Sequence, residues 1–291
     1  MENARDECRP GERVSWGWIR GENMTESDEL KFSHCDLNDL REAKIRLEYP
    51  SLTAKIADLV GRPIESGIKL LPKNWNQKVG EATKAALLKG LDFAIRTMGS
   101  GRETKDARDW LHKLIVASSG VAAGAVGPYS LIVELPFSTC VILRSIADIA
   151  RSEGHDISLV QTKLACLEVL ALGGRSPKDD SVETGYWTVR ATLATTVSEA
   201  ASHLAQKGLT EKGAPPLARF IAAIASRFSS VVTEEAAAIA IPVVGAISGG
   251  VVNYLFMNHF QQMARGHFAV KRLEKKYGQA LVEKTYNYLV I

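Results

Sequence analysis

The sequence contains two long stretches that are almost free of charged residues. Residues 236–264 contain no Asp, Glu, Lys or Arg, and residues 115–143 contain only Glu134. Each is nominally long enough to cross a bilayer, because a hydrocarbon core of about 30 Å needs about 20 helical residues. Pro128 and Pro136 divide the first stretch, and Asn, His and Gln make the end of the second costly in lipid. The stretches therefore predict either helical hairpins that touch a membrane or tightly packed helices of a soluble core.

Most of the chain repeats apolar residues at spacings of three and four. Such spacings are typical of amphipathic helices, and few segments show the strict alternation of a strand. With 46% apolar and 24% charged residues, the chain has the composition of a folded protein. We therefore predict an all-α fold, a multi-helix bundle. The predicted helices are 51–61, 75–98, 106–126, 137–153, 157–172, 186–207, 216–240, 242–277 and 279–288, with breaks or kinks at Pro128 and Pro136.

The two charge-poor stretches align with each other when the sequence is shifted by 121 residues. Segments Gly120–Glu153 and Ile241–Glu274 then share five identities in 34 positions. In each copy, a half rich in small apolar residues precedes an amphipathic half that carries arginine. We infer one domain over 37–290, with two repeat-like helical units built on Gly/Ala-rich apolar hairpins at about 75–173 and 186–290.

The N-terminal part differs in charge from the rest of the chain. Residues 1–50 contain 8 Lys or Arg against 12 Asp or Glu, whereas the remainder contains 28 against 21. We expect residues 1–36 to form a flexible acidic extension. The first residues lack the apolar run of a secretory signal, and the four cysteines lie far apart, so we expect no disulfide framework. These features favour a cytoplasmic location, and the charge-poor stretches favour a place at the inner face of the membrane.

The common catalytic and cofactor motifs are absent from the sequence. It has no GxxxxGK[ST], HExxH, GxSxG or paired CxxC, and no GxGxxG that opens a helix after a strand. His259 and His267 are eight residues apart, too far to share a metal ion without a third element. The tryptophans are scattered without interleaved basic residues. We therefore predict no catalytic residue, cofactor, metal site or nucleic-acid partner.

Glu134 is the acidic residue that most needs an explanation. A carboxylate within a long apolar stretch must be paired, protonated or exposed to water. One interpretation is a proton or cation site, or a partner for arginine from the other unit, with Arg144 and Arg265 as candidates at aligned positions. The alternative is that Glu134 caps a helix that begins at Pro136, where negative charge is favourable.

A basic segment follows the second charge-poor stretch. Its candidate contacts for lipid headgroups or a partner are Lys271, Arg272, Lys275 and Lys276. A basic residue near an anionic bilayer contributes about 1 kcal/mol of binding. The alternative interpretation is an ordinary solvated helix face.

Pairs of glycines four residues apart occur in both charge-poor stretches. Small residues at this spacing let two helix backbones approach closely, in lipid or in a protein core. The predicted close-packing positions are Gly120, Gly124, Gly245 and Gly249.

Two phrases of the sequence are familiar: LPFSTCVILRSIADIARSEGHD, with GVAAGAVGPYSLIVELP leading into it, and AIPVVGAISGGVVNYLFMNHFQQMARGHFAVKRLEKKYG. They resemble the EcsC family, over roughly residues 75 to 290 and without the acidic N-terminal part. The resemblance implies a bacterial protein from a family named for a member encoded beside the two parts of an ABC transporter. The family's biochemical role is generally regarded as unknown, so no catalytic residues carry over.

Two hypotheses about function follow from the sequence. The first is a non-enzymatic accessory protein that associates with the inner face of the cytoplasmic membrane or with a membrane complex for transport or secretion. The alternative is a soluble helical enzyme or ligand-binding protein, with a pocket between the two units and Glu134, Arg144 or Arg265 as its polar groups. The sequence leaves the oligomeric state open, a homo-oligomer included.

Overall fold

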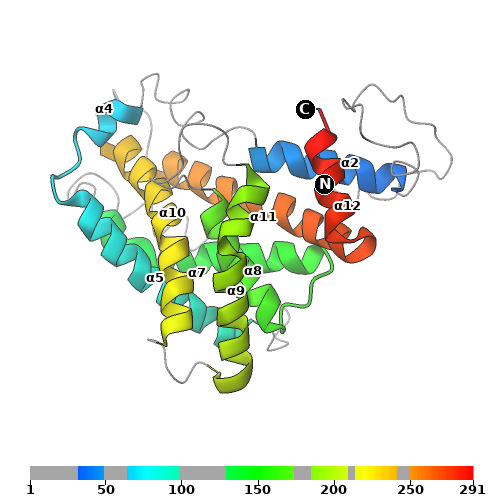
Figure 1. Ribbon diagram of the computed structural model, residues 1–291. Coiled ribbons are helices and arrows are strands. Elements are labelled where there is room, and N and C mark those ends of the chain that lie inside the picture. The colour runs from blue at the N-terminus through cyan, green and yellow to red at the C-terminus, as the bar shows by residue number, and fades with distance from the viewer. Residues whose placement is uncertain are drawn as a thin grey trace.

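The elements of the protein are helices throughout the part of the chain that the structure describes (Figure 1). This computed structural model describes residues 32–48, 64–98, 129–173, 185–208, 214–240 and 249–290. The helices are α2 (His34–Glu48), α4 (Ile64–Ile68), α5 (Trp75–Thr97), α7 (Tyr129–Ser152), α8 (Val160–Leu172), α9 (Tyr186–Lys207), α10 (Pro215–Ala240), α11 (Gly249–Tyr277) and α12 (Gln279–Tyr288). The predicted all-α fold is therefore confirmed. The predicted helices 51–61 and 106–126, and Gly120, Gly124 and Gly245, lie outside the described residues.

Local signals in the sequence explain most helix ends. Gly154 follows α7 with a φ of 82°, and Gly278 separates α11 from α12 with a φ of 86°. Residues other than glycine rarely adopt these backbone angles, so each glycine ends the preceding helix. Its N–H also satisfies a carbonyl of that helix, because the Gly278 N–H donates to the Glu274 carbonyl at 2.8 Å.

Pro136 does not end or begin a helix, which corrects the predicted start of a helix at residue 137. Helix α7 begins at Tyr129 and continues through Pro136. An interior proline removes one helical hydrogen bond and costs about 3 kcal/mol. The side chains of Leu131 and Leu135, which precede it in the helix, are buried in the main core, and this burial offsets the cost. Glu134 therefore lies within a continuous helix, and the interpretation that it caps a helix beginning at Pro136 is wrong.

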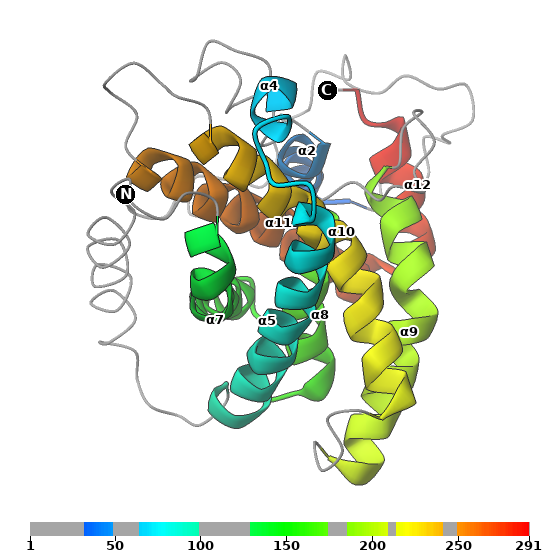
Figure 2. The same cartoon turned by 90° about the vertical axis from the view of Figure 1, so that its left-hand side faces the viewer.

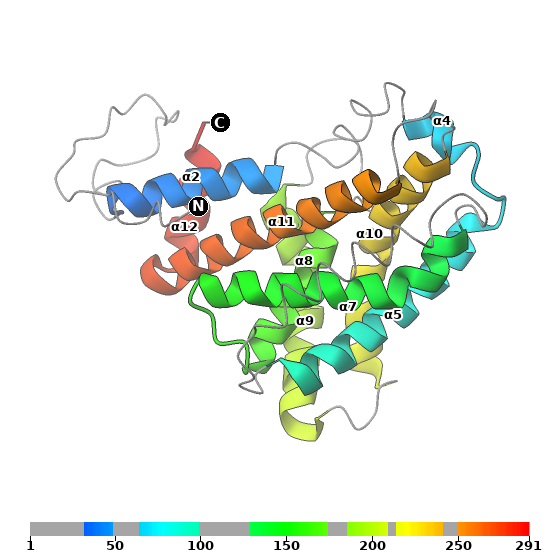
Figure 3. The same cartoon turned by 180° about the vertical axis from the view of Figure 1, so that it is seen from behind.

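Helices α7 and α11, which the internal alignment pairs, lie side by side and run in the same direction (Figure 3). Two contacts fix their register: Gln261 Nε2 donates to Ser145 Oγ at 2.9 Å, and Arg272 Nε donates to Glu153 Oε2 at 3.1 Å. Helix α5 packs along the other side of α7, and α10 packs against α4, α5, α8 and α9. None of the described helices is long and apolar enough to cross a membrane.

Two glycines within helices allow close approaches to a neighbouring helix. A Cβ at Gly90 of α5 would lie 2.6 Å from Leu143 Cδ1 of α7, and one at Gly266 of α11 would lie 2.6 Å from Leu47 Cγ of α2. At Gly266 the backbone of α2 is also close, since the Cβ would lie 3.0 Å from the Ala43 carbonyl oxygen. Helix α2 is thus packed directly on α11.

The N-terminal end of α2 departs from two expectations. Helix α2 begins at His34, inside the stretch 1–36 that the sequence suggested as a flexible extension. Cys35 is disulfide-bonded, although the scattered cysteines predicted no disulfide framework, whereas Cys140 and Cys166 are free thiols.

A second, smaller core joins Leu40 of α2 to buried residues of α9, α11 and α12. Helix α2 is therefore an integral part of this end of the fold.

Candidate functional sites along helix α11

Helix α11 connects three distinct environments. Its first turns are poor in charge, its middle lies in a buried polar network, and its last turns join an ionic cluster with α2. The distance along the helix from Tyr254 to Arg272 is about 27 Å, at 1.5 Å per residue. These environments can therefore be treated as separate candidate sites.

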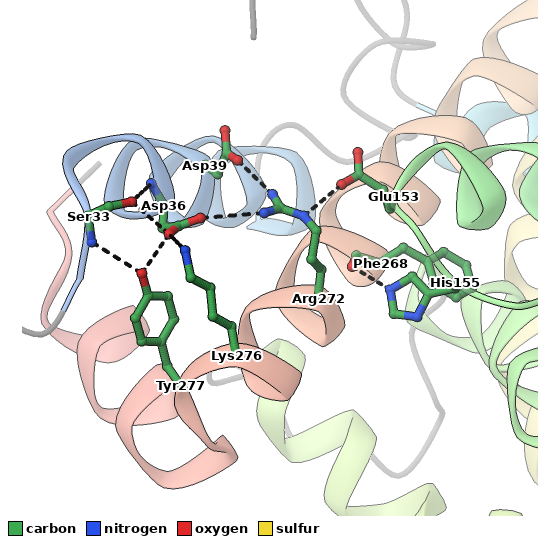
Figure 4. Close-up of polar contacts among 9 residues, drawn as sticks. All are labelled: Ser33, Asp36, Asp39, Glu153, His155, Phe268, Arg272, Lys276 and Tyr277. Atoms are coloured by element: carbon green, nitrogen blue, oxygen red, sulfur yellow. Dashed lines mark hydrogen bonds and ion pairs between the residues drawn. The ribbon is translucent and has the colours of Figure 1, made fainter. Parts of the chain in front are cut away.

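The ionic cluster centres on Arg272 (Figure 4). Its Nη2 lies 2.6 Å from Asp39 Oδ2, its Nε 3.1 Å from Glu153 Oε2 and its Nη1 3.5 Å from Asp36 Oδ1. The three carboxylates come from α2 and from the residue that follows α7, so one guanidinium holds three segments together. The Arg272 side chain is 30% exposed, which leaves water able to screen these pairs.

Asp36 is the second centre of the cluster. Its carboxylate accepts hydrogen bonds from Lys276 Nζ at 2.5 Å, Tyr277 Oη at 2.6 Å and Ser33 Oγ at 2.6 Å. Burial alone would raise the pKa of Asp36, but the hydrogen bonds from Lys276, Ser33 and Tyr277 outweigh it and lower the pKa to about 2. This acidic first turn of α2 meets the basic last turn of α11, an arrangement that both helix dipoles favour.

The four predicted headgroup contacts fall into two classes. Arg272 and Lys276 pair with carboxylates of the same chain, so much of their charge is already balanced. Lys271 is partly exposed and Lys275 is exposed. Contact between this basic segment and lipid stays a prediction, with less free charge available than the sequence suggests.

A buried polar network crosses the middle of α11. The Tyr186 hydroxyl lies 3.0 Å from His267 Nδ1, and Arg190 Nη1 donates to that hydroxyl at 3.3 Å. Arg190 also donates to both carboxylate oxygens of Glu274, at 2.6 and 3.1 Å. On its other side, His267 Nε2 lies 3.8 Å from Glu168 Oε2, too far for a hydrogen bond. Five polar side chains from α8, α9 and α11 thus form one chain of interactions.

Burial sets the protonation of this network. It raises the pKa of Glu168 and lowers the pKa of His267 well below the usual histidine value, so burial favours the neutral form of each group. Because Nε2 faces the Glu168 carboxyl and Arg190 donates to the Tyr186 hydroxyl, we assign the ring proton to Nε2. His267 is fully buried and Glu168 is 5% exposed, so the network orients three helices and offers no open reacting group.

The opposite end of α11 exposes apolar side chains. Val133 is 83% exposed and Phe137 is 45% exposed on α7, and Tyr254 is 64% exposed on α11. Ile68 of α4, which packs on α10, and Leu70 just after this helix are also exposed. Figure 2 faces this end, with α4 and the first turns of α7 toward the viewer. We call this region the apolar end, defined by Val133, Phe137 and Tyr254.

Two carboxyl groups accompany the apolar end. Glu134 on α7 is half-buried, and burial raises its pKa. Glu235 on α10 is only 4% exposed, and burial together with the nearby charge of Glu134 raises its pKa to about 8. Glu134 thus interacts with another acid, whereas Arg144 pairs with Asp148 of its own helix at 3.8 Å and Arg265 is exposed. None of the described contacts joins Glu134 to either arginine.

Local sequence patterns indicate only part of these sites. They single out Glu134 and the basic residues of α11, but not their partners Glu235, Asp36 and Asp39. Gly249, a predicted close-packing position, is the first residue of α11. The one local signal for the cluster was the Ser33–Asp36 spacing of an N-terminal capping box, since Asp36 N–H donates to Ser33 Oγ at 3.2 Å.

Comparison with known families gives a match over most of the chain. The model of the EcsC protein family matches residues 36–273. The chain belongs to the EcsC protein family. The match begins within α2, earlier than the resemblance noted over roughly residues 75 to 290, and the EcsC region includes the acidic partners of Arg272. No curated protein and no solved structure matched the chain.

Proposed function

We propose that this EcsC-family protein is a non-enzymatic accessory protein that associates with the cytoplasmic membrane or with a transport or secretion complex in it. The observation that carries the proposal is the exposure of Val133, Phe137 and Tyr254 at one end of two parallel helices. Large exposed apolar groups that cluster on a protein surface are typical of sites that bind a membrane or another protein.

The sequence around this end supports the same interpretation. The first charged residue of α11 after its start at Gly249 is Arg265, and α7 carries only Glu134 before Arg144. A protein surface exposed only to water usually carries more charge. Burying three such side chains is worth about 1.5 to 3 kcal/mol each when burial is complete, which suffices for reversible attachment.

The alternative, an enzyme or ligand-binding protein, has less support from the geometry. Its proposed polar groups Glu134, Arg144 and Arg265 make no described contact with one another. The best connected polar groups, around His267, are buried and contact mainly each other. A cytoplasmic accessory role therefore remains the better proposal.

Sedimentation with native bacterial membranes tests the proposal. Purified, detergent-free protein is mixed with inverted membrane vesicles, which display the cytoplasmic face, and then centrifuged. We expect the protein in the pellet with vesicles and in the supernatant without them. Protein that stays in the supernatant at every vesicle concentration would contradict the proposed function, and the soluble alternative would replace it.

A further inference from the structure

We infer that the apolar end binds the lipid bilayer itself, by shallow insertion of Val133, Phe137 and Tyr254 at the boundary between headgroups and acyl chains, without a requirement for anionic lipid. This inference rests on the proposed function and names the partner chemistry: a neutral or zwitterionic lipid interface.

The geometry brings the three side chains to one end of the molecule. The contacts Ser145–Gln261 and Glu153–Arg272 set the register of the parallel helices α7 and α11. In that register, Val133 and Phe137 are level with the first two turns of α11, where Tyr254 lies. Val133 and Phe137 are four residues apart and share one face of α7. The exposed groups therefore lie at the same end of the molecule.

Charge argues against recognition of anionic headgroups at this surface. The nearest arginines on these two helices are Arg144, about 10 Å along α7 from Phe137, and Arg265, about 16 Å along α11 from Tyr254. Helix α4 contributes Glu65 and, just after it, Lys69, which balance each other. Over their described residues, the first turns of α7 and α11 thus lack the run of basic residues that binding to anionic lipid needs.

Glu134 and Glu235 add acidic groups at this end. Glu134 lies between Val133 and Phe137 in sequence, and its carboxyl interacts with that of Glu235. Burial raises the pKa values of both, so less negative charge is present than two carboxylates would give. Neutral carboxyls are far cheaper to bring near lipid than ionised ones.

The type of side chain favours a bilayer over a protein groove. Tyrosine is enriched at membrane interfaces, because its ring enters the apolar region while its hydroxyl stays among the headgroups. None of the helices that the structure describes is long and apolar enough to cross the bilayer, and the proposed insertion of these three side chains is into one leaflet. In the last turns of α11, Arg272 and Lys276 pair with carboxylates of α2, and Arg272 lies about 27 Å along the helix from Tyr254.

Flotation with protein-free lipid vesicles tests the inference. Vesicles of phosphatidylcholine alone, and of phosphatidylcholine mixed with phosphatidylglycerol, are used at low and high salt. The test variant is V133S/F137S/Y254S, with V133S/Y254S as a second variant that keeps the partly packed Phe137. The matched control is L159S/V290S, which removes two large apolar side chains exposed elsewhere, at 51% and 40%.

We expect the unmodified protein to float with both lipid mixtures at both salt concentrations. The triple variant should bind about 100-fold more weakly, the double variant should lie between, and the control should bind normally. Unchanged far-UV circular dichroism and thermal unfolding establish that the variants fold.

Several results would overturn the inference while leaving the proposed function intact. Binding that needs phosphatidylglycerol and disappears at high salt would assign attachment to basic residues. Equal flotation of the triple variant and the control would place the contact on another surface. Sedimentation with native membranes without flotation on pure lipid would make the partner a membrane protein. Failure in both assays would reject the proposed function as well.

Discussion

Glu235 offers a direct test of the electrostatics at the apolar end. The pKa of its buried carboxyl is raised from 4.5 to about 8, by burial and by the neighbouring charge of Glu134. Between these two pH values the carboxyl is ionised in the unfolded chain and protonated in the folded protein. Unfolding then releases a proton, so the free energy of unfolding falls as the pH rises through this window. The substitution Glu235→Gln removes this dependence and keeps the size of the side chain.

The size of the effect follows from the pKa change. One pKa unit corresponds to about 1.4 kcal/mol, so a carboxyl that titrates at about 8 in place of 4.5 costs the protein about 5 kcal/mol of stability above pH 8. We expect E235Q and the unmodified protein to have similar stability near pH 4.5 and to diverge in favour of E235Q as the pH rises. Urea denaturation at a series of pH values measures this difference.

A second substitution tests the cause. Glu134→Gln removes the neighbouring charge, which should lower the pKa of Glu235. The difference in free energy of unfolding between E134Q/E235Q and E134Q should therefore be smaller than the difference between E235Q and the unmodified protein. The buried Glu168 also has a raised pKa, but it is present in both proteins and cancels in the comparison. Parallel stability curves for E235Q and the unmodified protein from pH 5 to pH 9 would refute the reasoning.

Three further predictions concern the helix contacts. Glu274→Gln should lower the free energy of unfolding by about 3 kcal/mol in urea, because the largely buried Arg190 loses its carboxylate; a change near zero would contradict this. Gly266→Ala should lower the melting temperature through a clash with α2, whereas Gly80→Ala, with open space, should not; equal effects would argue against the packing. Asp36→Asn should lower the free energy of unfolding at neutral pH, and this loss should disappear as the pH falls from 3.8 to about 2. Equal free energies of unfolding at neutral pH would contradict a stabilising role of the carboxylate.

Helix positions were largely predictable because their signals are local. The predicted bounds 186–207 and 279–288 agree with α9 and α12, and the prediction 216–240 differs from α10 by one residue. Glycine or proline adjoins each of these helices, and the apolar spacing between such residues does not depend on the rest of the fold. Pro136 shows the limit of this reasoning, since packing against α5 overrides a local helix breaker.

The partners within the sites were not predictable in the same way. Asp36 and Arg272 are 236 residues apart, and nothing in either local pattern indicates that they meet. Helix α2 itself escaped prediction because its sequence is mainly polar and its amphipathic pattern is weak. The alignment at a shift of 121 residues did bring together two helices, α7 and α11, that lie side by side. It could not indicate that Glu134 would face Glu235 in place of an arginine.

The arrangement of α11 also makes the orientation of the protein on a membrane measurable. If α11 lay flat on the bilayer, its apolar first turns and its basic last turns could both touch lipid, and binding would rise with anionic lipid content. If α11 stood steeply, only the apolar end would reach the surface, because about 27 Å separates Tyr254 from Arg272. Helix α2 covers part of the basic end with Asp36 and Asp39, which weakens the flat orientation. The dependence of binding on lipid charge therefore reports the tilt of α11, and its absence would indicate the steep orientation.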